Sequence, residues 1–439
     1  MRIKVPHFLF MKRTIAFKTV GCRLNQYETE ALASQFSRNE YDIVEFDKPA
    51  DVYAVNSCTV TNQSDQKTRT IVNHASRLKH KPMVVVMGCM SPEQQKHFTD
   101  NTAITYLIDN EKKSGVFQLV DAHFKGELLD KEQLANNRFN YEITDPLFHT
   151  RSFIKIQDGC DNFCTYCIIP MVRGMAVSRP VNEIIDNIRQ AVTNGYKEIV
   201  ITGVNISRYY SDNVHFEELI ERILNMPEHF RLRISSMEPD ELNDKFISLM
   251  NHPKLCPHLH LCLQSGSDKI LMKMNRMYSI DAYLKLVDKI KSANPLFNIT
   301  TDIMVGFPGE SAADFEETCF VAKTVGFSHI HTFKYSKRSG TRADRMPEQV
   351  FEPTKNQRSE IIRKISEENK INYFKKMIGI EQIILVEKIK DGTASGYGEH
   401  YVPVKFIASE FIDENSLVRV LLTDIDEGEE PFMIGQVMR

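Results

Sequence analysis

The sequence predicts an α/β protein with three successive parts: an N-terminal parallel α/β domain, a central partial (βα)6 barrel and a small antiparallel β-barrel. The first observation behind this prediction is an alternation of strand-like apolar runs with amphipathic helical stretches up to residue 375, which favours parallel sheets covered by helices. The second is a change near residue 376 to short β-rich runs separated by Gly, Asp and Glu. The length of 439 residues accommodates about three domains.

The individual elements follow this order along the chain. In the N-terminal part we expect strands at 14–20, 52–55 and 83–87 and helices at 27–39 and 65–78. Six strands that are each followed by a helix then fit an incomplete barrel better than an open sheet. We expect these strands at 152–157, 197–202, 230–235, 258–263, 298–305 and 329–333, and their helices at 181–194, 216–225, 240–250, 279–292, 311–324 and 355–376. The last five strands are expected at 382–386, 392–397, 402–406, 417–423 and 432–437.

These elements set the expected domain boundaries. We assign residues 12–125 to the N-terminal domain, 126–145 to a linker, 146–375 to the barrel domain and 376–439 to the C-terminal β-barrel. Residues 1–11 precede the first strand and are expected to be an extension or an upstream start. We expect no signal peptide, because Pro6 interrupts a short apolar patch and no cleavage site follows it.

Composition narrows the class of protein. The chain has 55 Lys and Arg against 58 Asp and Glu, which gives a formal net charge of −3. Its content of 42% hydrophobic and 26% charged residues is typical of a globular protein rather than a disordered one. No apolar run approaches the roughly 20 residues of a membrane span, so we expect no membrane partner. Nine cysteines, an odd number in a long chain, fit a reducing compartment better than a secreted disulfide framework, and we expect a cytoplasmic protein.

Three cysteines form a compact motif just after the first expected barrel strand. Cys160, Cys164 and Cys167 lie on one loop that Asp158 and Gly159 open. Three thiolates crowded together suit an iron–sulfur cluster or zinc. A four-iron cluster held by three cysteines keeps one iron without a protein ligand, whereas structural zinc nearly always takes four protein ligands and no histidine is close in the sequence. The spacing therefore favours a [4Fe-4S] cluster with an open iron.

A second set of cysteines follows the three expected strands of the N-terminal domain. Cys22, Cys58 and Cys89 each come directly after a strand, and the carboxyl ends of parallel strands lie on one edge of a sheet. A single buried cysteine is more often a packing residue, but three in the same position of successive units predict a second cluster. The remaining cysteines have no such spacing and are expected in the core: Cys256, Cys262 and Cys319.

With these motifs in place, the chain resembles the radical S-adenosylmethionine (SAM) methylthiotransferases over nearly its whole length. This family has an N-terminal α/β domain, a radical SAM barrel and a small C-terminal TRAM barrel. The resemblance rests on the motifs GCRLNQYE at 21–28, NSCTVT at 56–61, DGC at 158–160, RG at 173–174, RISSMEP at 233–239, LQSGS at 263–267 and DIMVGFPGE at 302–310. The continuations NQYETE at 25–30 and CTVTN at 58–62 are most similar to the branch that modifies N6-threonylcarbamoyladenosine.

The resemblance implies an enzyme that methylthiolates C2 of threonylcarbamoyladenosine at position 37 of tRNA. It implies SAM and two [4Fe-4S] clusters as cofactors, one cluster cleaving SAM and the other carrying sulfur, so that no catalytic side-chain triad is needed. It leaves open the electron donor, the sulfur source, the tRNA species and the oligomeric state. The alternatives are methylthiolation of isopentenyladenosine in tRNA or of a ribosomal protein side chain, and, more remotely, a non-catalytic metal-containing RNA-binding protein.

The resemblance and the geometry of such barrels also point to residues around SAM, because ligands bind at the carboxyl ends of the strands. We expect Tyr166 near the adenine and Arg276 as a partner of the SAM carboxylate. Four further residues at strand ends are expected to line the pocket: Asn205, Glu238, Gln264 and Gly306.

Candidate RNA contacts lie on the helix expected after the Cys58 strand. Its cations are Lys67, Arg69, Arg77, Lys79 and Lys81, although a solvated helix face is an equally good interpretation. The segment 375–439 has seven basic against twelve acidic residues, which is the wrong sign for broad contact with phosphates.

Overall fold

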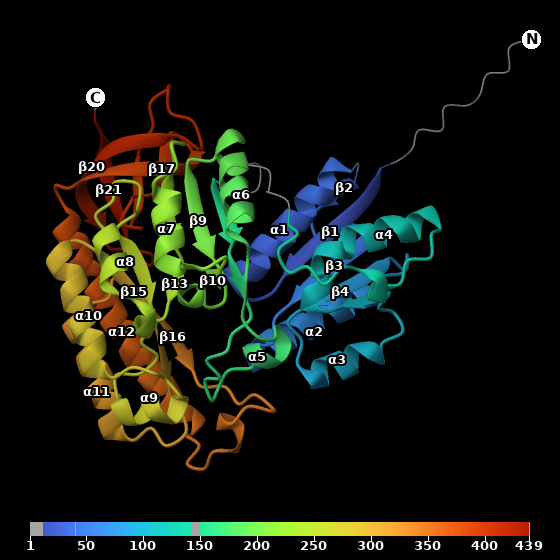
Figure 1. Cartoon of the computed structure of the whole chain (residues 1–439), viewed down its shortest axis with the longest axis horizontal. Coiled ribbons are helices and arrows are strands. Elements are labelled where there is room, and N and C mark those ends of the chain that lie inside the picture. The colour runs from blue at the N-terminus through green and yellow to red at the C-terminus, as the bar shows by residue number, and fades with distance from the viewer. Residues whose placement is uncertain (1–11, 40, 142–149, 439) are drawn as a thin grey trace, which may run out of the picture. The chain divides into compact units, whose positions relative to one another are not determined.

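The protein is described from a computed structural model, which covers residues 12–39, 41–141 and 150–438. Within these residues the chain forms two compact units (Figure 1). The first comprises residues 12–141 and 171–173, and the second comprises residues 150–170 and 174–438. The expected N-terminal extension and the end of the expected linker lie outside the described residues, and the predicted domain boundaries stay a prediction.

The first unit is built on a parallel sheet of five strands in the order β2-β1-β3-β4-β5. Its strands are β1 (Arg13–Thr19), β2 (Tyr41–Val44), β3 (Val52–Ser57), β4 (Met83–Gly88) and β5 (Tyr106–Ile108). Its helices are α1 (Arg23–Arg38), α2 (Asn62–Ser76), α3 (Pro92–Thr99) and α4 (Val116–Lys125), with short 3-10 turns at η1 (Asn110–Gly115) and η2 (Lys131–Gln133). The predicted parallel α/β domain is confirmed.

The centre of this sheet explains where the cysteines lie. Every residue of β3 and β4 is buried; β4 has no polar side chain, and β3 ends in the polar residues Asn56 and Ser57. Thr19 of β1 pairs with Asn56 of β3, and Asn56 pairs with Met87 of β4. The carboxyl ends of β1, β3 and β4 therefore lie side by side, and the residues that follow them share one edge.

The second unit contains six parallel strand positions, each followed by at least one helix. Two sheets, β12-β9-β6 and β13-β14-β15-β16, are joined by a parallel bridge between Leu232 and Leu255. No pairing connects β6 with β16 in the part of the chain that the structure describes, so the barrel is open, as predicted. The strands are β6 (Arg151–Lys155), β9 (Glu198–Thr202), β12 (Arg231–Ile234), β13 (Ser236–Met237), β14 (His258–Leu261), β15 (Asn298–Val305) and β16 (His329–Lys334).

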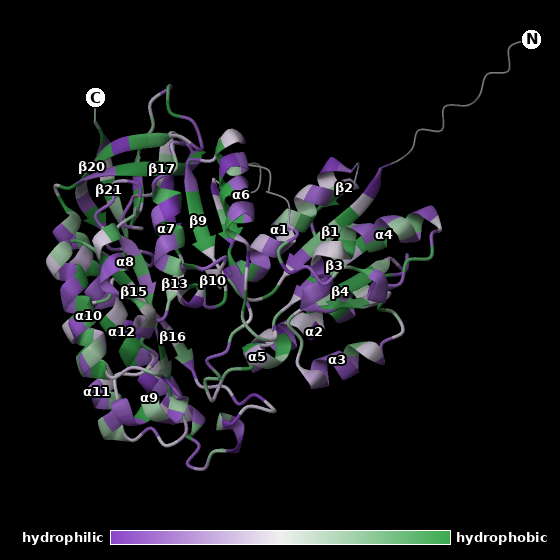
Figure 2. Ribbon diagram, viewed as in Figure 1, coloured by the Kyte–Doolittle hydropathy of each residue, from purple (hydrophilic) through white to green (hydrophobic). Residues whose placement is uncertain are grey.

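The helices of this unit cover the strands from outside. Strand β9 is buried along its length, and Figure 2 shows it as hydrophobic while the turns of α7 that face the viewer are largely hydrophilic. The helices are α6 (Val181–Thr193), α7 (Phe216–Leu224), α8 (Asp244–Leu249), α9 (Asp268–Met274), α10 (Ile280–Ala293), α11 (Ala312–Val325) and α12 (Glu352–Met377). The short helix α5 (Ile169–Val172) begins in this unit, and its last two residues belong to the first. Shorter elements are β7 (Gln157–Asp158), β8 (Val177–Ser178), η3 (Ile206–Arg208), β10 (Tyr210–Ser211), β11 (Val214–His215), η4 (Pro239–Glu241) and η5 (Ala343–Arg345).

The C-terminal strands close into a barrel in the order β17-β18-β19-β21-β20. They are β17 (Glu381–Lys390), β18 (Thr393–Tyr397), β19 (Pro403–Ile407), β20 (Leu417–Asp426) and β21 (Phe432–Val437). The barrel itself was predicted, but a purely antiparallel arrangement was wrong, because β19 and β21 pair in parallel. A closed ring with an odd number of strands cannot alternate in direction throughout, so one parallel pair is unavoidable.

The C-terminal barrel is attached to the amino-terminal ends of the partial barrel's strands. At the start of β12, Arg231 donates to the Ile383 carbonyl (2.6 Å), and at the start of β15 the Asn298 amide donates to the His400 carbonyl (2.6 Å). Beneath them the buried Glu198 accepts hydrogen bonds from Arg231 and Arg233. Figure 1 shows this barrel at the opposite end of the unit from α9. The carboxyl ends of the strands are thus left for a site.

Among the described helices none is both long and apolar enough to cross a membrane.

Candidate active site

The first cysteine site lies at the carboxyl edge of the five-stranded sheet. Cys22 precedes the first residue of α1 and is exposed, whereas Cys58 and Cys89 are buried. The three thiols are close enough for Cys22 and Cys89 both to raise the pKa of Cys58. The structure therefore brings together the three cysteines that the strand positions predicted.

Two glycines allow the strand ends to approach each other. Gly21 has a φ of +106°, and a Cβ atom on it would lie 2.6 Å from the Cys58 sulfur. Gly88 has the same φ, and its Cβ would lie 2.4 Å from the Asn56 side chain. Both the backbone conformation and the missing side chain are needed here, so the Gly-Cys pairs at the ends of β1 and β4 are part of the site.

Polar side chains fix the three strand ends to one another. The Asn25 amide donates to the carbonyls of Val20 (3.0 Å) and Ser57 (2.8 Å). The Asn56 amide donates to the Asn25 carbonyl (2.8 Å), and the Ser57 hydroxyl donates to the Cys89 carbonyl (3.0 Å). These bonds are buried, which makes each one costly to lose.

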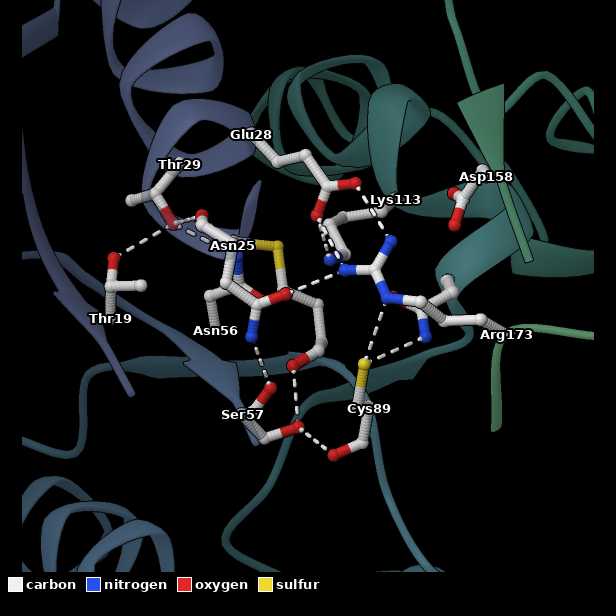
Figure 3. Close-up of polar contacts among 12 residues, drawn as sticks. Thr19, Asn25, Glu28, Thr29, Asn56, Ser57, Cys89, Lys113, Asp158 and Arg173 are labelled. Atoms are coloured by element: carbon white, nitrogen blue, oxygen red, sulfur yellow. Dashed lines mark hydrogen bonds and ion pairs between the residues drawn. The ribbon is translucent and has the colours of Figure 1, made fainter. Parts of the chain in front are cut away.

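A charged network supports the third cysteine, as Figure 3 shows. The Arg173 Nε and the Asn110 amide both donate to the Cys89 sulfur, at 3.2 and 3.3 Å. The guanidinium also contacts both carboxylate oxygens of Glu28 at 3.2 Å, and the buried Lys113 ammonium lies 2.5 Å from the same carboxylate. Two N–H donors therefore hold the Cys89 sulfur in place at the edge of the sheet.

The second cysteine site is the loop that follows β6 and β7. Cys160, Cys164 and Cys167 are each half-buried. The loop is anchored from outside, because Thr165 N–H donates to the Met274 carbonyl (3.0 Å) and Ala343 N–H donates to the Thr165 carbonyl (2.8 Å). These two backbone hydrogen bonds tie the cysteine loop to the end of α9 and to the segment after β16.

The entry to this loop requires glycine. Gly159 has a φ of +72°, and a Cβ atom there would lie 2.0 Å from the Met175 carbonyl oxygen. The Gln157 amide nitrogen donates to the Gly159 carbonyl (2.8 Å), while its oxygen accepts from Asn205 N–H (2.7 Å). Gln157 therefore ties the start of the cysteine loop to the end of β9.

Several predicted SAM-pocket residues gather beside these thiols. Arg276 donates to both carboxylate oxygens of Glu238, one of them at 3.1 Å, and its Nη1 lies 3.5 Å from the Cys164 sulfur. Burial raises the pKa of Tyr166, the Arg276 charge lowers it and Cys164 raises it. Tyr166 therefore lies close to both Arg276 and Cys164. The guanidinium expected to meet the SAM carboxylate is thus paired with Glu238 in the protein itself.

The remaining predicted pocket residues are also at strand ends. The Asn205 Nδ2 is buried and has no hydrogen-bond acceptor among the described residues. The Asn205 side chain lies close enough to Cys160 to lower the pKa of that thiol, against the larger effect of burial. Gln264 has a φ of +65° and its backbone pairs with β15. Gly306 has a φ of +74° and its N–H donates to the Glu310 carboxylate (2.6 Å). An orphaned buried donor such as Asn205 fits a site that a polar ligand completes.

The chemistry of both sites suits metal-bound thiolates. Burial raises the pKa of Cys160, raises that of Cys167 to about 12 and, with the neighbouring thiols, raises that of Cys58 to about 11. These thiols are neutral near pH 7, and each must release its proton when a soft metal binds. Three sulfur ligands on each unit fit an iron–sulfur cluster.

The predicted RNA contacts are all exposed. Lys67 and Arg69 lie on α2, and Arg77, Lys79 and Lys81 follow its end. Their role stays a prediction. Two of the three cysteines expected in the core, Cys256 and Cys262, are buried, while Cys319 is half-buried.

The sequence analysis found the cysteines but missed the residues that hold them in place through hydrogen bonds and ion pairs. Arg173, Glu28 and Asn25 belong to recognisable motifs, but Asn110 and Lys113 lie in a segment with no motif and reach the site only through the fold. The available signal was charge: Lys113 is a basic residue that becomes fully buried, which requires a partner.

Comparisons with known proteins agree with this geometry. The radical SAM superfamily matches residues 154–322, and the uncharacterized protein family UPF0004 matches residues 14–108. The chain is 37% identical over 417 residues to threonylcarbamoyladenosine tRNA methylthiotransferase MtaB of Thermotoga maritima, covering 93% of this chain and 94% of the relative. It is 35% identical over 379 residues to tRNA-2-methylthio-N(6)-dimethylallyladenosine synthase of Endomicrobium trichonymphae, covering 85% and 89%.

Among solved structures, the radical SAM methyltransferase TsrM from Kitasatospora setae has the same fold, with a TM-score of 0.57, 13% identity and coverage of 88% of this chain and 81% of that one. The barrel and its cysteine loop define a radical SAM enzyme, which uses SAM and a [4Fe-4S] cluster. Within this class, the chain belongs to the radical SAM methylthiotransferase family.

Proposed function

We propose that this protein attaches a methylthio group to C2 of threonylcarbamoyladenosine at position 37 of tRNA. The observation that carries this proposal is the presence of two separate three-cysteine sites, each at the carboxyl edge of a parallel sheet. A transferase that generates a radical from SAM and also delivers sulfur needs two such sites. The substrate is supported by the names of the relatives, which match nearly the full length of this chain.

Each cysteine trio would hold one [4Fe-4S] cluster with one iron that has no protein ligand. When bound, the clusters and SAM would supply the radical and the sulfur, and an electron donor would reduce the cluster that cleaves SAM. The protein contributes thiolates, a closed environment and orientation. Burial raises the pKa of Cys58 and of Cys167, so each of these thiols would release a proton on binding a cluster.

In the second unit the chain's residues would bind and orient SAM. Asn205 Nδ2 is a donor beside Cys160 that has no acceptor among the described residues. Gly306, in the turn after β15, has no side chain that would block a ligand. Glu238 holds Arg276 against Cys164 and would share it with the SAM carboxylate. Tyr166 and Gln264 would line the same pocket.

In the first unit Arg173 and Asn110 would act on the sulfur-carrying cluster through Cys89. Their N–H groups donate hydrogen bonds to that sulfur and would orient it toward the cluster. The partner is tRNA. Its phosphates would contact Lys67 and Arg69 on α2 and Arg77, Lys79 and Lys81 after the end of that helix. We place the reaction in the cytoplasm and assign neither the electron donor nor the sulfur source.

The test is nucleoside analysis of tRNA from a strain that lacks the gene. We expect methylthio-threonylcarbamoyladenosine to disappear and the unmodified threonylcarbamoyladenosine to accumulate. Complementation with the wild type should restore it, Cys22→Ala and Cys160→Ala should not, and Cys319→Ala serves as a control cysteine outside both sites. An unchanged content of the methylthio nucleoside in the deletion strain would refute the proposal.

The same samples decide between this substrate and the alternatives. Loss of methylthio-isopentenyladenosine instead would match the dimethylallyladenosine relative, and a mass change in a ribosomal protein would indicate a protein substrate. Anaerobic reconstitution should give about eight irons per chain and deoxyadenosine from SAM. Zinc alone, with no deoxyadenosine, would instead indicate a binding protein.

A further inference from the structure

An exposed aromatic ring lies directly beside the SAM-cluster cysteines. Phe163 precedes Cys164, and half of its surface is exposed (50%). Its φ is +49°, a conformation that is costly for a residue with a side chain. Burial of the ring does not repay this cost, so the loop holds an apolar ring in solvent at the mouth of the site.

The backbone of Phe163 is fixed from two sides. Its carbonyl accepts hydrogen bonds from the Asn275 amide at the end of α9 and from the Arg342 guanidinium, both at 3.3 Å. The ring is therefore displayed by a rigid support. A rigid exposed aromatic ring is a good stacking surface, because little conformational entropy is lost when a flat group covers it.

The same edge carries a strong local charge. Residues 334–345, which begin at the last residue of β16, include five basic residues and one acidic residue, Asp344. Lys337, Arg342 and Arg345 are exposed, and Ala343 N–H anchors the segment to the cysteine loop through Thr165. We call Phe163 together with residues 334–345 the aromatic–basic rim. Its charge contrasts with the C-terminal segment 375–439, which has seven basic and twelve acidic residues.

We propose that the aromatic–basic rim binds the single-stranded anticodon loop of tRNA, with Phe163 stacked on a base beside the target nucleotide and Arg342 and Arg345 on phosphates. RNA loops are recognised by bases stacked on aromatic side chains and by cations on the backbone. The rim supplies both next to Cys164, where the target must be held. This inference rests on the proposed function and locates its substrate on the second unit.

The test measures binding of fluorescently labelled tRNA to the cluster-loaded full-length protein at several salt concentrations. Phe163→Ala should weaken binding about tenfold, because the stacking contact with one base is lost, and Phe163→Tyr should restore it. Arg342→Glu/Arg345→Glu should weaken binding at least tenfold and reduce the salt dependence by one to two counterions. Arg363→Glu/Lys364→Glu on α12, also exposed, is the matched charge control and should bind like the wild type.

All variants are compared at equal iron content. Deoxyadenosine release is also measured without tRNA, because a variant that damages the cysteine loop would lose this activity even when no RNA is present. Wild-type affinity in both Phe163→Ala and Arg342→Glu/Arg345→Glu would overturn the inference, whatever the affinity of Lys67→Glu/Arg69→Glu on α2. Failure of the proposed function has a different signature: the wild-type protein itself would then yield no methylthio-threonylcarbamoyladenosine, whatever the rim variants do.

Discussion

The buried ion pair between Glu28 and Lys113 gives a quantitative prediction about the first cysteine site. Both side chains are almost completely buried, and the Lys113 ammonium lies 2.5 Å from the carboxylate. Glu28→Gln keeps the shape of the side chain but removes its charge. Removing one partner of a buried pair costs about 3–5 kcal/mol, because the other charge stays buried without compensation.

The cost of Glu28→Gln should depend on pH with a definite sign. Burial lowers the pKa of Lys113, and Glu28 opposes that effect, so the variant lowers the pKa further. The unfolded chain then binds the proton more readily than the folded chain, and stability rises with pH. The deficit relative to the wild type should therefore shrink as the pH rises toward the ordinary pKa of lysine.

Hydrogen exchange of the full-length protein measures this deficit locally. At pH 7 the amides of α1 and β4 should exchange at least a hundredfold faster in Glu28→Gln, because every 1.4 kcal/mol is a factor of ten. Glu28→Gln/Lys113→Met also removes one of the two buried cations that contact Glu28 and should recover part of the loss, while Arg173 stays without its carboxylate. The reasoning fails if Glu28→Gln changes exchange less than fivefold, or if the double variant is no more stable than the single one.

Three further predictions concern the second unit. Glu198→Gln should lower the free energy of unfolding by about 3–5 kcal/mol, measured as a lower thermal midpoint. Burial alone would raise the pKa of Glu198, but the surrounding arginines lower it overall. The difference in stability from the wild type should therefore be lost as the pH falls toward that lowered pKa. Gly159→Ala should lose the iron of the cysteine loop in an iron and sulfide analysis, whereas Gly126→Ala, with the same φ but no atom within 4 Å of the new Cβ, should keep it. Glu238→Gln should reduce deoxyadenosine release at least tenfold at unchanged iron content, because it frees Arg276; an unchanged rate would remove Glu238 from the SAM site.

The sequence contained most of the fold because the periodic signals are strong. The central strands β3 and β4 and all six barrel strand positions were predicted within a few residues. Helix starts were less well predicted, because capping decides them: α2 begins after Thr61, whose side chain accepts from Ser64 N–H (3.1 Å). The edge strands β2 and β5 were not predicted, since three or four residues paired on one side carry little periodic signal.

The cysteines could be predicted because parallel topology converts sequence position into spatial position. A residue that follows a parallel strand must lie on the carboxyl edge, so Cys22, Cys58 and Cys89 had to be neighbours. No such rule places Lys113 or Asn110, which enter the site from a 3-10 turn. The pairing of Arg276 with Glu238 across the barrel likewise depends on tertiary packing, which local patterns do not encode.

The attachment of the C-terminal barrel has a consequence for the size of any shared ligand. That barrel holds the amino-terminal ends of β12 and β15, while the cysteine loop lies at the carboxyl edge. Strand β15 has eight residues, and at about 3.3 Å per residue it spans about 26 Å. A nucleoside cannot bridge that length, so only an extended polymer could touch both ends at once, and damage to the C-terminal barrel should then weaken substrate capture while leaving SAM cleavage intact.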